Sequence, residues 1–497
     1  MNKNINLILL GVLIILLSGI TQSCKTSFDG DEDENLPPNT FTVVDTIIRL
    51  GDERLTSEVH IRWWGDDPDG YVVGYEFTFD DVVTPATDWS FTEKRDSVFI
   101  LAPPPGNDTI DFRFSVRAVD NEGARDPSPA SVVYPVKNSP PVIQFQPAVN
   151  RPVKTFPAVR FFWEADDPDG KENLLEIEVY WNDTLNDPFI VPATTSGAIF
   201  RATSPDQSIS EAQVFLNNSL NAENANIEGM ILDDYNQLII RSVDQSLAKS
   251  SFVYSDSVFI KRVNSSVLLV NAYGNQNPTV ESFYANNLTA NGINVFDTLH
   301  LFEQSAGAFT QLSSDNPTQA MVFDFFETII WFGDNAQNSL SLAQRTTNPF
   351  FESGGKLMLI LYFSSLFDEQ SQFLDFTPIQ SLVIPGSDTT LTITDTTTFN
   401  PIISGYPPLQ STSFLSVVRP INLILNASPI YSANISARHN PTFTFSPWTG
   451  NSTIIGKRTN SQGKTNFIIS TIELHRLNGN NNAVDLFEKL LLDEFEL

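Results

Sequence analysis

Cysteine is almost absent from this chain: of 497 residues, Cys24 alone is a cysteine. No disulfide can therefore form within the chain, and its domains must hold together by packing alone. Histidine is also scarce, with four residues scattered along the sequence, so a zinc site is not expected. The sequence contains no HExxH, P-loop, GxGxxG or CxxC motif. These absences argue against the enzyme classes that such motifs define.

Positive charge is in short supply. The chain has 29 Lys and Arg against 59 Asp and Glu, a net charge of −30. Such a surface repels phosphate groups, so nucleic acid is excluded as a partner, and anionic headgroups are repelled as well. The length suggests about three domains of 100–200 residues each.

Long apolar runs are missing except for Leu7 to Leu17, which is eleven residues long. A membrane-spanning helix needs about 20 residues, so this run is too short. Lys3 precedes it and Cys24 follows it, and together they resemble a lipoprotein signal peptide. The resemblance implies that residues 1–23 are removed and that Cys24 carries lipid, including palmitate, that binds a membrane. Thr21 departs from the family pattern, which has leucine there; an ordinary secretory peptide or an uncleaved anchor is the alternative.

Residues 24–39 form an acidic segment that includes Asp29, Asp31, Glu32, Asp33 and Glu34. A run of like charges cannot bury itself, so we expect a solvated tether. The segment resembles the surface-export signals of some Gram-negative lipoproteins, which predicts an outer-membrane protein exposed at the cell surface. A plain flexible spacer on a periplasm-facing anchor is the alternative.

Two stretches repeat at a spacing of one hundred residues: Ile61–Gly70 and Phe161–Gly170. Each is an apolar strand that ends in Asp-Asp-Pro-Asp-Gly, a strong turn sequence, and each leads into a further strand. Alternating strands with the pattern Arg-x-Val-Asp follow, at Phe112–Asp120 and Leu238–Asp244. The sequence therefore predicts two copies of one β domain.

The Trp-bearing strand, the turn and the late Arg-x-Val-Asp strand together resemble fibronectin type III and immunoglobulin-like sandwiches. The resemblance implies all-β domains at residues 40–138 and 139–263, with an insertion near 182–230 in the second copy.

The two turns offer carboxylates that are hard oxygen ligands of the kind calcium prefers. A structural turn and a calcium site both remain open, because no complete ligand set follows either loop. The carboxylates are Asp66, Asp67, Asp69, Asp166, Asp167 and Asp169.

From residue 264 to 497 buried-type strands alternate with helices, which predicts a doubly wound α/β domain. The expected strands are 267–270, 293–296, 328–332, 357–363 and 466–472, and the expected helices begin at Pro278, contain Leu340, or run from 483 to 495. Three motifs, VLLVNAYG, TIIWFGD and FFESGGKLMLI, resemble the class I glutamine-amidotransferase-like (flavodoxin-like) fold. Residues 376–463 look like a β-rich insertion.

That family carries a cysteine on a glycine-flanked elbow after the strand matching 357–363, where this chain has Tyr362-Phe363-Ser364. The resemblance therefore implies no catalytic residue. A triad of Ser364, His475 and Glu473 is the catalytic alternative, and it would require the last two to share one face of a strand.

Doubly wound folds bind ligands at the carboxyl ends of their strands. Asn271, Tyr273, Gly274, Asp334 and Asn335 follow two such strands and are the candidate pocket. We therefore expect a non-catalytic surface protein that binds an extracellular protein or glycan and needs no cofactor other than calcium. A hydrolase of glycan or peptide, and a structural subunit of an envelope assembly, are the alternatives.

Overall fold

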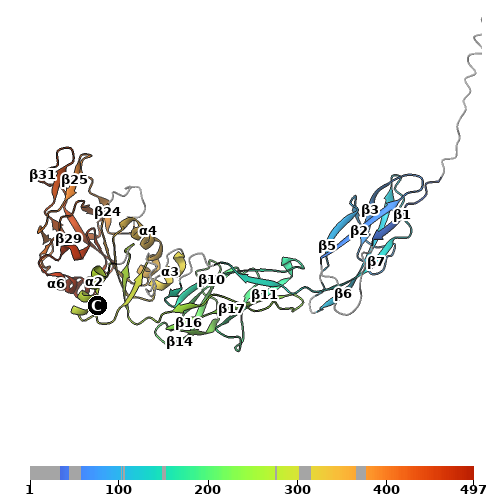
Figure 1. The fold of residues 1–497 in the computed structure, drawn as a ribbon, viewed down its shortest axis with the longest axis horizontal. Helices are drawn as coiled ribbons and strands as arrows, with labels where there is room; N and C mark the ends of the chain where they lie inside the picture. The colour runs from blue at the N-terminus through green and yellow to red at the C-terminus, as the bar shows by residue number, and fades with distance from the viewer. Residues whose placement is uncertain are drawn as a thin grey trace, which may run out of the picture. The chain divides into compact units, whose positions relative to one another are not determined.

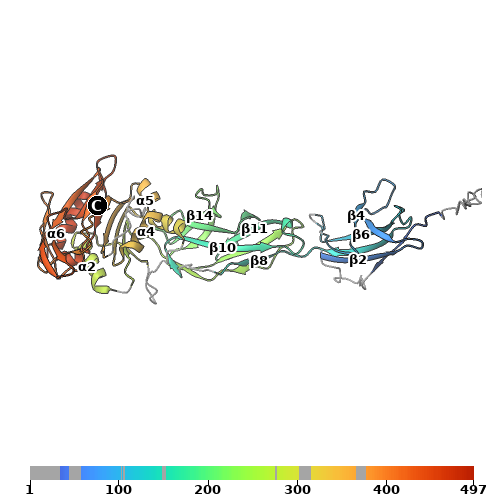
Figure 2. The ribbon, with the colours of Figure 1, turned by 90° about the horizontal axis from the view of Figure 1, so that it is seen from above.

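The computed structural model describes most of the chain: residues 34–43, 58–101, 103–104, 107–147, 153–274, 277–301, 315–364 and 376–497. The predicted leader, Cys24 and the first part of the acidic tether lie outside these residues. The chain divides into two compact units (Figure 1, Figure 2), Met1–Pro103 with Thr109–Lys137, and Pro104–Asp108 with Asn138–Leu497. Within the described residues, no helix is long and apolar enough to cross a membrane.

The first unit is a β-sandwich with one sheet in the order β1-β2-β5 and a second in the order β4-β3-β6-β7. This order is that of an immunoglobulin-like sandwich of the fibronectin type III kind. Its strands are β1 (Asn39–Val43), β2 (Glu58–Asp66), β3 (Val72–Thr78), β4 (Ser90–Thr92), β5 (Asp96–Ile100), β6 (Thr109–Asp120) and β7 (Ala130–Lys137).

The second unit begins with a sandwich of the same design, confirming the predicted repeat. Its sheets have the orders β15-β14-β13-β10-β8 and β12-β11-β17-β18, and three short strands pair as β16-β19-β9. The predicted insertion supplies β12 to β15, of which β14 and β15 widen the first sheet. The strands are β8 (Val142–Phe145), β9 (Lys154–Thr155), β10 (Ala158–Asp166), β11 (Leu174–Trp181), β12 (Phe189–Pro192), β13 (Gly197–Ala202), β14 (Ile209–Leu216), β15 (Asn226–Ile231), β16 (Asp234–Asn236), β17 (Leu238–Asp244), β18 (Val253–Tyr254) and β19 (Val258–Ile260).

Each sandwich is built around one tryptophan of the repeated strand. Trp63 on β2 and Trp163 on β10 are almost completely buried, whereas the neighbouring Phe162 is exposed, as the alternation of a half-buried strand requires. The indole Nε1 of Trp63 donates to the carbonyl oxygen of Lys94 (3.0 Å), and that of Trp163 donates to Thr195 (2.8 Å). The buried N–H groups are thus satisfied in the same way in both copies.

A second repeated feature is a largely buried glutamate held by two cations. In the first sandwich Glu76 on β3 pairs with Arg117 (2.6 Å) and Arg125 (2.9 Å). The guanidinium of Arg117 also lies 4.1 Å from the centroid of the Trp89 ring. These contacts assign the arginine of the Arg-x-Val-Asp pattern a structural role.

The second sandwich repeats this cluster around Glu178 on β11, whose side chain is 5% exposed. Arg241 and Lys249 pair with its two carboxylate oxygens, the latter at 2.7 Å, and Arg241 stacks on Phe252 at 4.3 Å. Both cations lower the pKa of Glu178, outweighing the effect of burial, which raises it.

The C-terminal part of the second unit contains a nine-stranded sheet in the order β21-β20-β22-β23-β33-β32-β29-β26-β27. Its first five strands are parallel: β20 (Val267–Asn271), β21 (Asp297–His300), β22 (Thr328–Gly333), β23 (Lys356–Leu361) and β33 (Thr465–Ser470). Four of the five predicted strands are therefore present within two residues of their expected ends.

Helices cover both faces of this parallel sheet. Helix α2 (Pro278–Ala290) and α6 (Ala483–Glu488), which continues as a π-helical turn (Lys489–Glu494), pack on one face. The helices α3 (Asn316–Phe323), α4 (Ala336–Thr346) and α5 (Asn348–Glu352) pack on the other. The predicted start of α2 is confirmed, since Asn277 caps it by accepting from the Val280 amide (3.3 Å).

The predicted strand at 293–296 is wrong: β21 begins at Asp297. The Ile293 amide donates to the carbonyl of Leu288 (3.0 Å), near the C-terminal end of α2. This segment therefore caps the helix instead of forming a strand. Ile293 and Phe296 pack on the core from a loop. The Asp297 carboxylate then anchors the strand by accepting from the Asn264 amide (2.8 Å) and pairing with Lys261 (2.5 Å).

The predicted insertion at 376–463 is β-rich, and four of its strands extend the main sheet, which the sequence did not predict. β32 pairs with β33 in the antiparallel sense, so the parallel sheet becomes a mixed one. The strands are β24 (Ile379–Leu382), β25 (Thr389–Thr392), β26 (Thr398–Pro401), β27 (Leu409–Gln410), β28 (Ile421–Leu423), β29 (Ala427–Ala433), β30 (Ser436–His439), β31 (Thr444–Pro447) and β32 (Thr453–Thr459).

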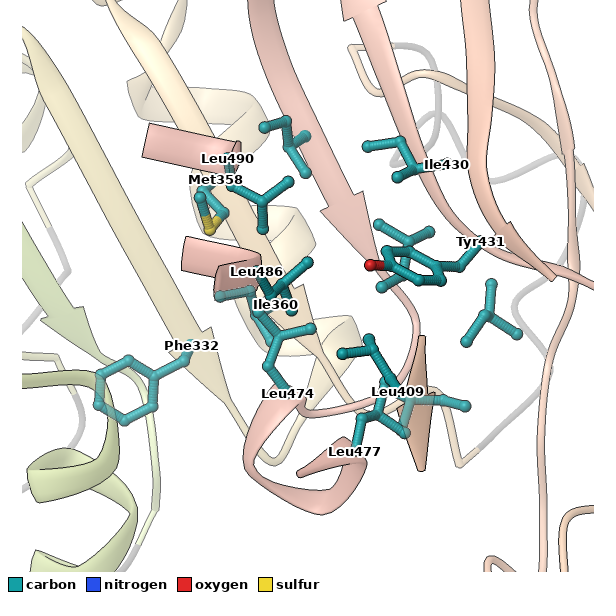
Figure 3. Close-up of a cluster of buried hydrophobic side chains, with 14 of the residues drawn as sticks. Phe332, Met358, Ile360, Leu409, Ile430, Tyr431, Leu474, Leu477, Leu486 and Leu490 are labelled. Carbon is teal, nitrogen blue, oxygen red and sulfur yellow. The ribbon is translucent and has the colours of Figure 1, made fainter. Parts of the chain in front are cut away.

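One apolar cluster joins the insertion to the parallel sheet. Figure 3 shows Tyr431 and Leu409 of the insertion in the same cluster as Ile360 of β23 and Leu486 of α6. The Tyr431 hydroxyl donates to the carbonyl of Pro407 (2.6 Å), so its buried polar end is satisfied. The insertion is therefore part of the domain core.

The second sandwich also packs against the helical layer of the sheet. Phe156 is fully buried in the core formed with α3 and α4 and meets Phe326 edge-on, with ring centroids 5.3 Å apart. Two ion pairs flank this contact, Arg160–Asp315 (3.1 Å) and Arg201–Asp324 (2.8 Å).

Candidate functional site

Three of the five predicted pocket residues meet where strands β20 and β22 end. Gly274, Asp334 and Asn335 line a pocket of about 330 Å³ together with Ala272 and Asn338. The Gly274 amide faces Asp334 Oδ1 at 3.4 Å. β20 is paired with β21 on one side and with β22 on the other, so the chain crosses over at this point. Such a switch point leaves a crevice above the strand ends.

Asn271 lies at a neighbouring pocket of about 320 Å³ that it shares with Asn277, Glu281 and His300. Its Nδ2 donates to Glu281 Oε2 (2.9 Å), and His300 Nε2 lies 2.7 Å from the same oxygen. The hydrogen bond from His300 is the main cause that lowers the pKa of Glu281. The sequence alone does not predict this pair, because Glu281 and His300 come from α2 and β21, which are adjacent only in the folded chain.

Tyr273 points into the protein rather than into a pocket. Its hydroxyl donates to Glu473, a buried carboxylate that also faces Arg476 at 3.4 Å. Burial, and then the charge of Glu473, raise the pKa of Tyr273 far above its usual value. Burial raises the pKa of Glu473 as well, and the nearby Asp334 adds to that rise. Tyr273 therefore acts as a neutral hydrogen-bond donor.

The geometry assumed for the Ser364–His475–Glu473 triad is wrong. β33 ends at Ser470, and His475 lies in a short 3-10 helix, η3 (Leu474–Leu477), so the residues do not share a strand face. The His475 ring packs against Phe283 with centroids 6.1 Å apart. Among the described residues, no hydrogen bond joins Ser364 to His475.

Tyr362 occupies the segment after β23 that the sequence resemblance matched to the elbow of the amidotransferase family. Its hydroxyl donates to the carbonyl of Val417 in the insertion (3.0 Å), and the guanidinium of Arg476 lies 5.0 Å from its ring centroid. The insertion thus holds this end of β23 in place.

The turn of the second sandwich contains buried carboxyl groups. Asp167 and Asp169 are 5% and 1% exposed, and Asp244 at the end of β17 is 1% exposed. The amide of Ser139 donates to Asp169 Oδ2 (2.9 Å), and Asn138 Nδ2 donates to Asp244 Oδ2 (2.5 Å). Burial first, and then the charges of Asp169 and Asp244, raise the pKa of Asp167 to about 6.

The first sandwich repeats these hydrogen bonds around less buried groups, since Asp69 is exposed and Asp67 is half-buried. The amide of Leu36 donates to Asp69 Oδ2 (2.9 Å), and Asn35 Nδ2 donates to Asp120 Oδ2 (2.8 Å). Burial first, and then the charges of Asp69 and Asp120, raise the pKa of Asp67.

Asp66 and Asp166, the first aspartates of the two turns, are exposed, and so is Asp69. The residues that donate to these aspartates belong to a motif that the sequence repeats: Asn-x-Pro-Pro occurs at residues 35–38 and again at 138–141. Asp, Glu, His and Cys side chains alone do not form a metal-holding group of three anywhere in the described residues.

No protein-family model matches the chain, and no curated protein is similar to it. Solved structures that resemble it are mostly tandem β-sandwiches. The fibronectin(III)-like modules of Clostridium thermocellum CbhA are 12% identical over 42% of this chain and 87% of theirs, with a TM-score of 0.17. The PKD1 domain of Vibrio anguillarum Epp is 16% identical over 21% of this chain and 98% of its own, with a TM-score of 0.15.

The FN1–FN3 domains of chicken CNTN1 are 10% identical over 46% of this chain and 99% of theirs, with a TM-score of 0.15. At such scores the likenesses carry no argument by themselves. The fibronectin type III assignment of the two sandwiches rests on their strand order.

We expect His475 to make the α/β part less stable as the pH falls from about 6.5 to about 4. Burial, and then the charge of Arg476, lower the pKa of His475 to about 4. The unfolded chain, with a histidine pKa near 6.5, binds the proton more tightly, so stability is complete above pH 6.5 and is lost below it. The loss amounts to about 3 kcal/mol, at ~1.4 kcal/mol for each unit of pKa difference.

Urea unfolding of the wild type and of His475→Gln between pH 4 and pH 7 measures this contribution. As the pH falls, the free energy of unfolding of the wild type should decrease by about that amount relative to that of His475→Gln. His439→Gln, at an exposed position, is the control and should follow the wild type. Equal pH dependence in His475→Gln and the wild type would contradict the assignment.

Proposed function

We propose that this protein is a cell-surface lipoprotein, anchored through lipid on Cys24, whose C-terminal domain binds a ligand without catalysis. The domain is of the class I glutamine-amidotransferase-like, flavodoxin-like type. In support, its parallel strands have the order second, first, third, fourth, fifth along the chain, which is that of doubly wound flavodoxin-like sheets. The two sandwiches precede this domain in the chain.

The observation that carries the binding proposal is the position of the 330 Å³ pocket. It lies between the ends of β20 and β22, the first and third parallel strands, where doubly wound folds bind their ligands. Asn335 also caps α4 by accepting from the Asn338 amide (3.0 Å), so the pocket rim is tied to a helix end.

The contacts of Tyr362 support a non-catalytic domain. An amidotransferase nucleophile needs a sharp turn directly after the strand that matches β23. Here Tyr362 is bound to Val417 and covered by Arg476, and Phe363 is fully buried. A nucleophile at either of these two positions would lack access to a substrate.

The chemistry of the rim favours a hydroxyl-rich ligand, and we infer a glycan. Asp334 offers carboxylate oxygens, Asn335 and Asn338 offer amide groups, and Gly274 offers a backbone N–H. Sugar hydroxyls both donate and accept, so they suit this mixed set. An anionic ligand would meet the charge of Asp334.

Glycan-array binding by the full chain tests this function. The wild type should bind a defined set of neutral glycans, and Asp334→Ala should reduce that binding at least tenfold, since one charge-assisted hydrogen bond contributes about 1.5–3 kcal/mol. Glu352→Ala, exposed at the opposite end of β23, is the matched control. Binding that Asp334→Ala leaves unchanged would contradict the proposal. Hydrolysis of a bound glycan, abolished by Ser364→Ala, would support the hydrolase alternative instead.

A further inference from the structure

The second sandwich has a cleft of about 600 Å³ on one side, between its two sheets. Strand β12 is the end strand of one sheet and β15 is the end strand of the other. One wall of the cleft comes from residues 186–190 and the other from residues 223–228, while Trp181 lies at the end of β11 between them. The volume is in the range of ligand sites, about 300–1,000 Å³.

The inserted strands of the second sandwich create this cleft. In the described part of the first sandwich the corresponding sheet ends at β5, whereas here β14 and β15 continue it. The side chain of Asn182 donates to the carbonyl oxygen of Gly229 (2.8 Å) and so ties the end of β11 to β15. Gly229 has a φ of 99°, and a Cβ there would lie 3.0 Å from the carbonyl oxygen of Trp181. A glycine is therefore needed for this close approach, which fixes the spacing of the two walls.

The charges at the cleft have one sign. Four exposed carboxylates line it, and they come from both walls: Asp183, Asp187, Glu223 and Glu228. No lysine, arginine or histidine lines the cleft, and within the described part of the chain none of the four carboxylates forms an ion pair. A cleft lined by charges of one sign concentrates their field, so this one attracts cations.

The cleft also offers an apolar wall and two strand edges. Phe189 is half-buried and Ile190 is 45% exposed, and both lie on β12. Within the described strands β12 pairs only with β11, and β15 pairs only with β14. Each strand thus has one side without a sheet partner, where the backbone of an extended chain can pair.

We propose that this cleft binds an extended, arginine-bearing segment of a partner protein. A guanidinium pairs with carboxylates through its planar fork and stacks on aromatic rings, and its apolar stem packs on surfaces such as Phe189 and Ile190. The backbone of the segment pairs with an edge strand. A small polyamine would match the charges but would use neither the apolar wall nor the strand edge. This surface is separate from the pocket of the C-terminal domain and adds a second partner.

Fluorescence anisotropy with a labelled peptide of four Arg-Val repeats tests the proposal on the full chain, purified in detergent, at physiological ionic strength. Asp187→Asn with Glu223→Gln removes one charge from each wall and should weaken binding at least about tenfold, because hydrogen bonds to charged groups are the strong ones. Glu172→Gln with Asp206→Asn is the matched control: it removes the same charge from exposed positions of this sandwich outside the cleft. It should keep the affinity within about twofold, since distant exposed charges are screened.

Two further ligands make the result specific. A peptide with citrulline in place of arginine keeps the shape without the charge and should bind at least about tenfold more weakly. Spermidine should compete poorly, and competition as strong as that of the arginine peptide would make the cleft a polyamine site and overturn the proposal. Equal weakening by both double variants would show a general attraction to the acidic surface and would also overturn it, as would no binding at ~1 mM peptide.

Discussion

Replacing Cys24 with alanine is expected to release the protein from the membrane fraction completely. Cys24 is the only cysteine, and it follows an apolar run that is too short to span a membrane. Under the proposed lipidation, attachment depends on the lipid: two or more acyl chains hold a protein stably, whereas none leaves only weak surface contact. The strongly negative chain gains nothing from anionic headgroups. Fractionation of Gram-negative cells, with labelled palmitate as the tracer, measures both attachment and modification.

Ser23→Ala is the matched control, because it keeps a small residue next to the cysteine and should leave attachment and labelling unchanged. Protease treatment of intact cells then separates the two orientations. Loss of the wild-type protein from intact cells supports surface exposure, and protection indicates a periplasm-facing anchor. If the Cys24→Ala protein stays in the membrane fraction, the leader is an uncleaved anchor and the lipoprotein assignment fails.

Glu178→Ala is expected to destabilise the second sandwich by about 3 kcal/mol, in the range found when one partner of a buried ion pair is removed. The carboxylate is almost fully buried and binds Arg241, Lys249 and the Tyr180 hydroxyl, the last at 2.7 Å. Its removal leaves two cations beside an apolar layer with no counter-charge. Such a loss corresponds to about a hundredfold change in an opening equilibrium.

Hydrogen exchange of peptides from β11 and β17, measured in the full chain, reports this change at the site. Glu176→Ala is the control: it lies two residues earlier on the same strand and is half-buried. Its amides should exchange within about threefold of the wild-type rate, as for a substitution costing under 1 kcal/mol. If Glu178→Ala exchanges no faster than Glu176→Ala, the charge cluster contributes no net stability.

The two sandwiches were predictable because their signals are local and occur twice. An alternating strand with a central tryptophan, a turn built from proline, aspartate and glycine, and a second strand follow one another within about twenty residues. Trp63 and Trp163 are buried as that pattern requires. Hydrophobic alternation sets which face of a strand is buried, and turn residues set where it reverses, and neither depends on distant parts of the chain.

In the C-terminal part, the apolar runs of the sequence predicted the central strands correctly but misplaced the edge strand β21. β22 and β23 are continuous apolar runs with neighbours on both sides, so every residue is buried or nearly so. The run at 293–296 is also apolar, but these residues end α2 and cover the core as a loop. Burial alone does not distinguish an edge strand from such a loop. The anchoring of Asp297 by Lys261 and Asn264 decides where β21 begins.

The sequence by itself determined the number of sandwiches, the turn at each corner, the central strands of the parallel sheet and three residues of one pocket. Each of these follows from residues that are close together in the chain. The tertiary structure alone decided that Asn271 meets Glu281 and His300, that Tyr273 turns inward to Glu473, and that Asp244 joins Asp167 and Asp169. These groups come from strands and loops far apart in sequence, and only the packing that buries them brings their charges within reach of one another.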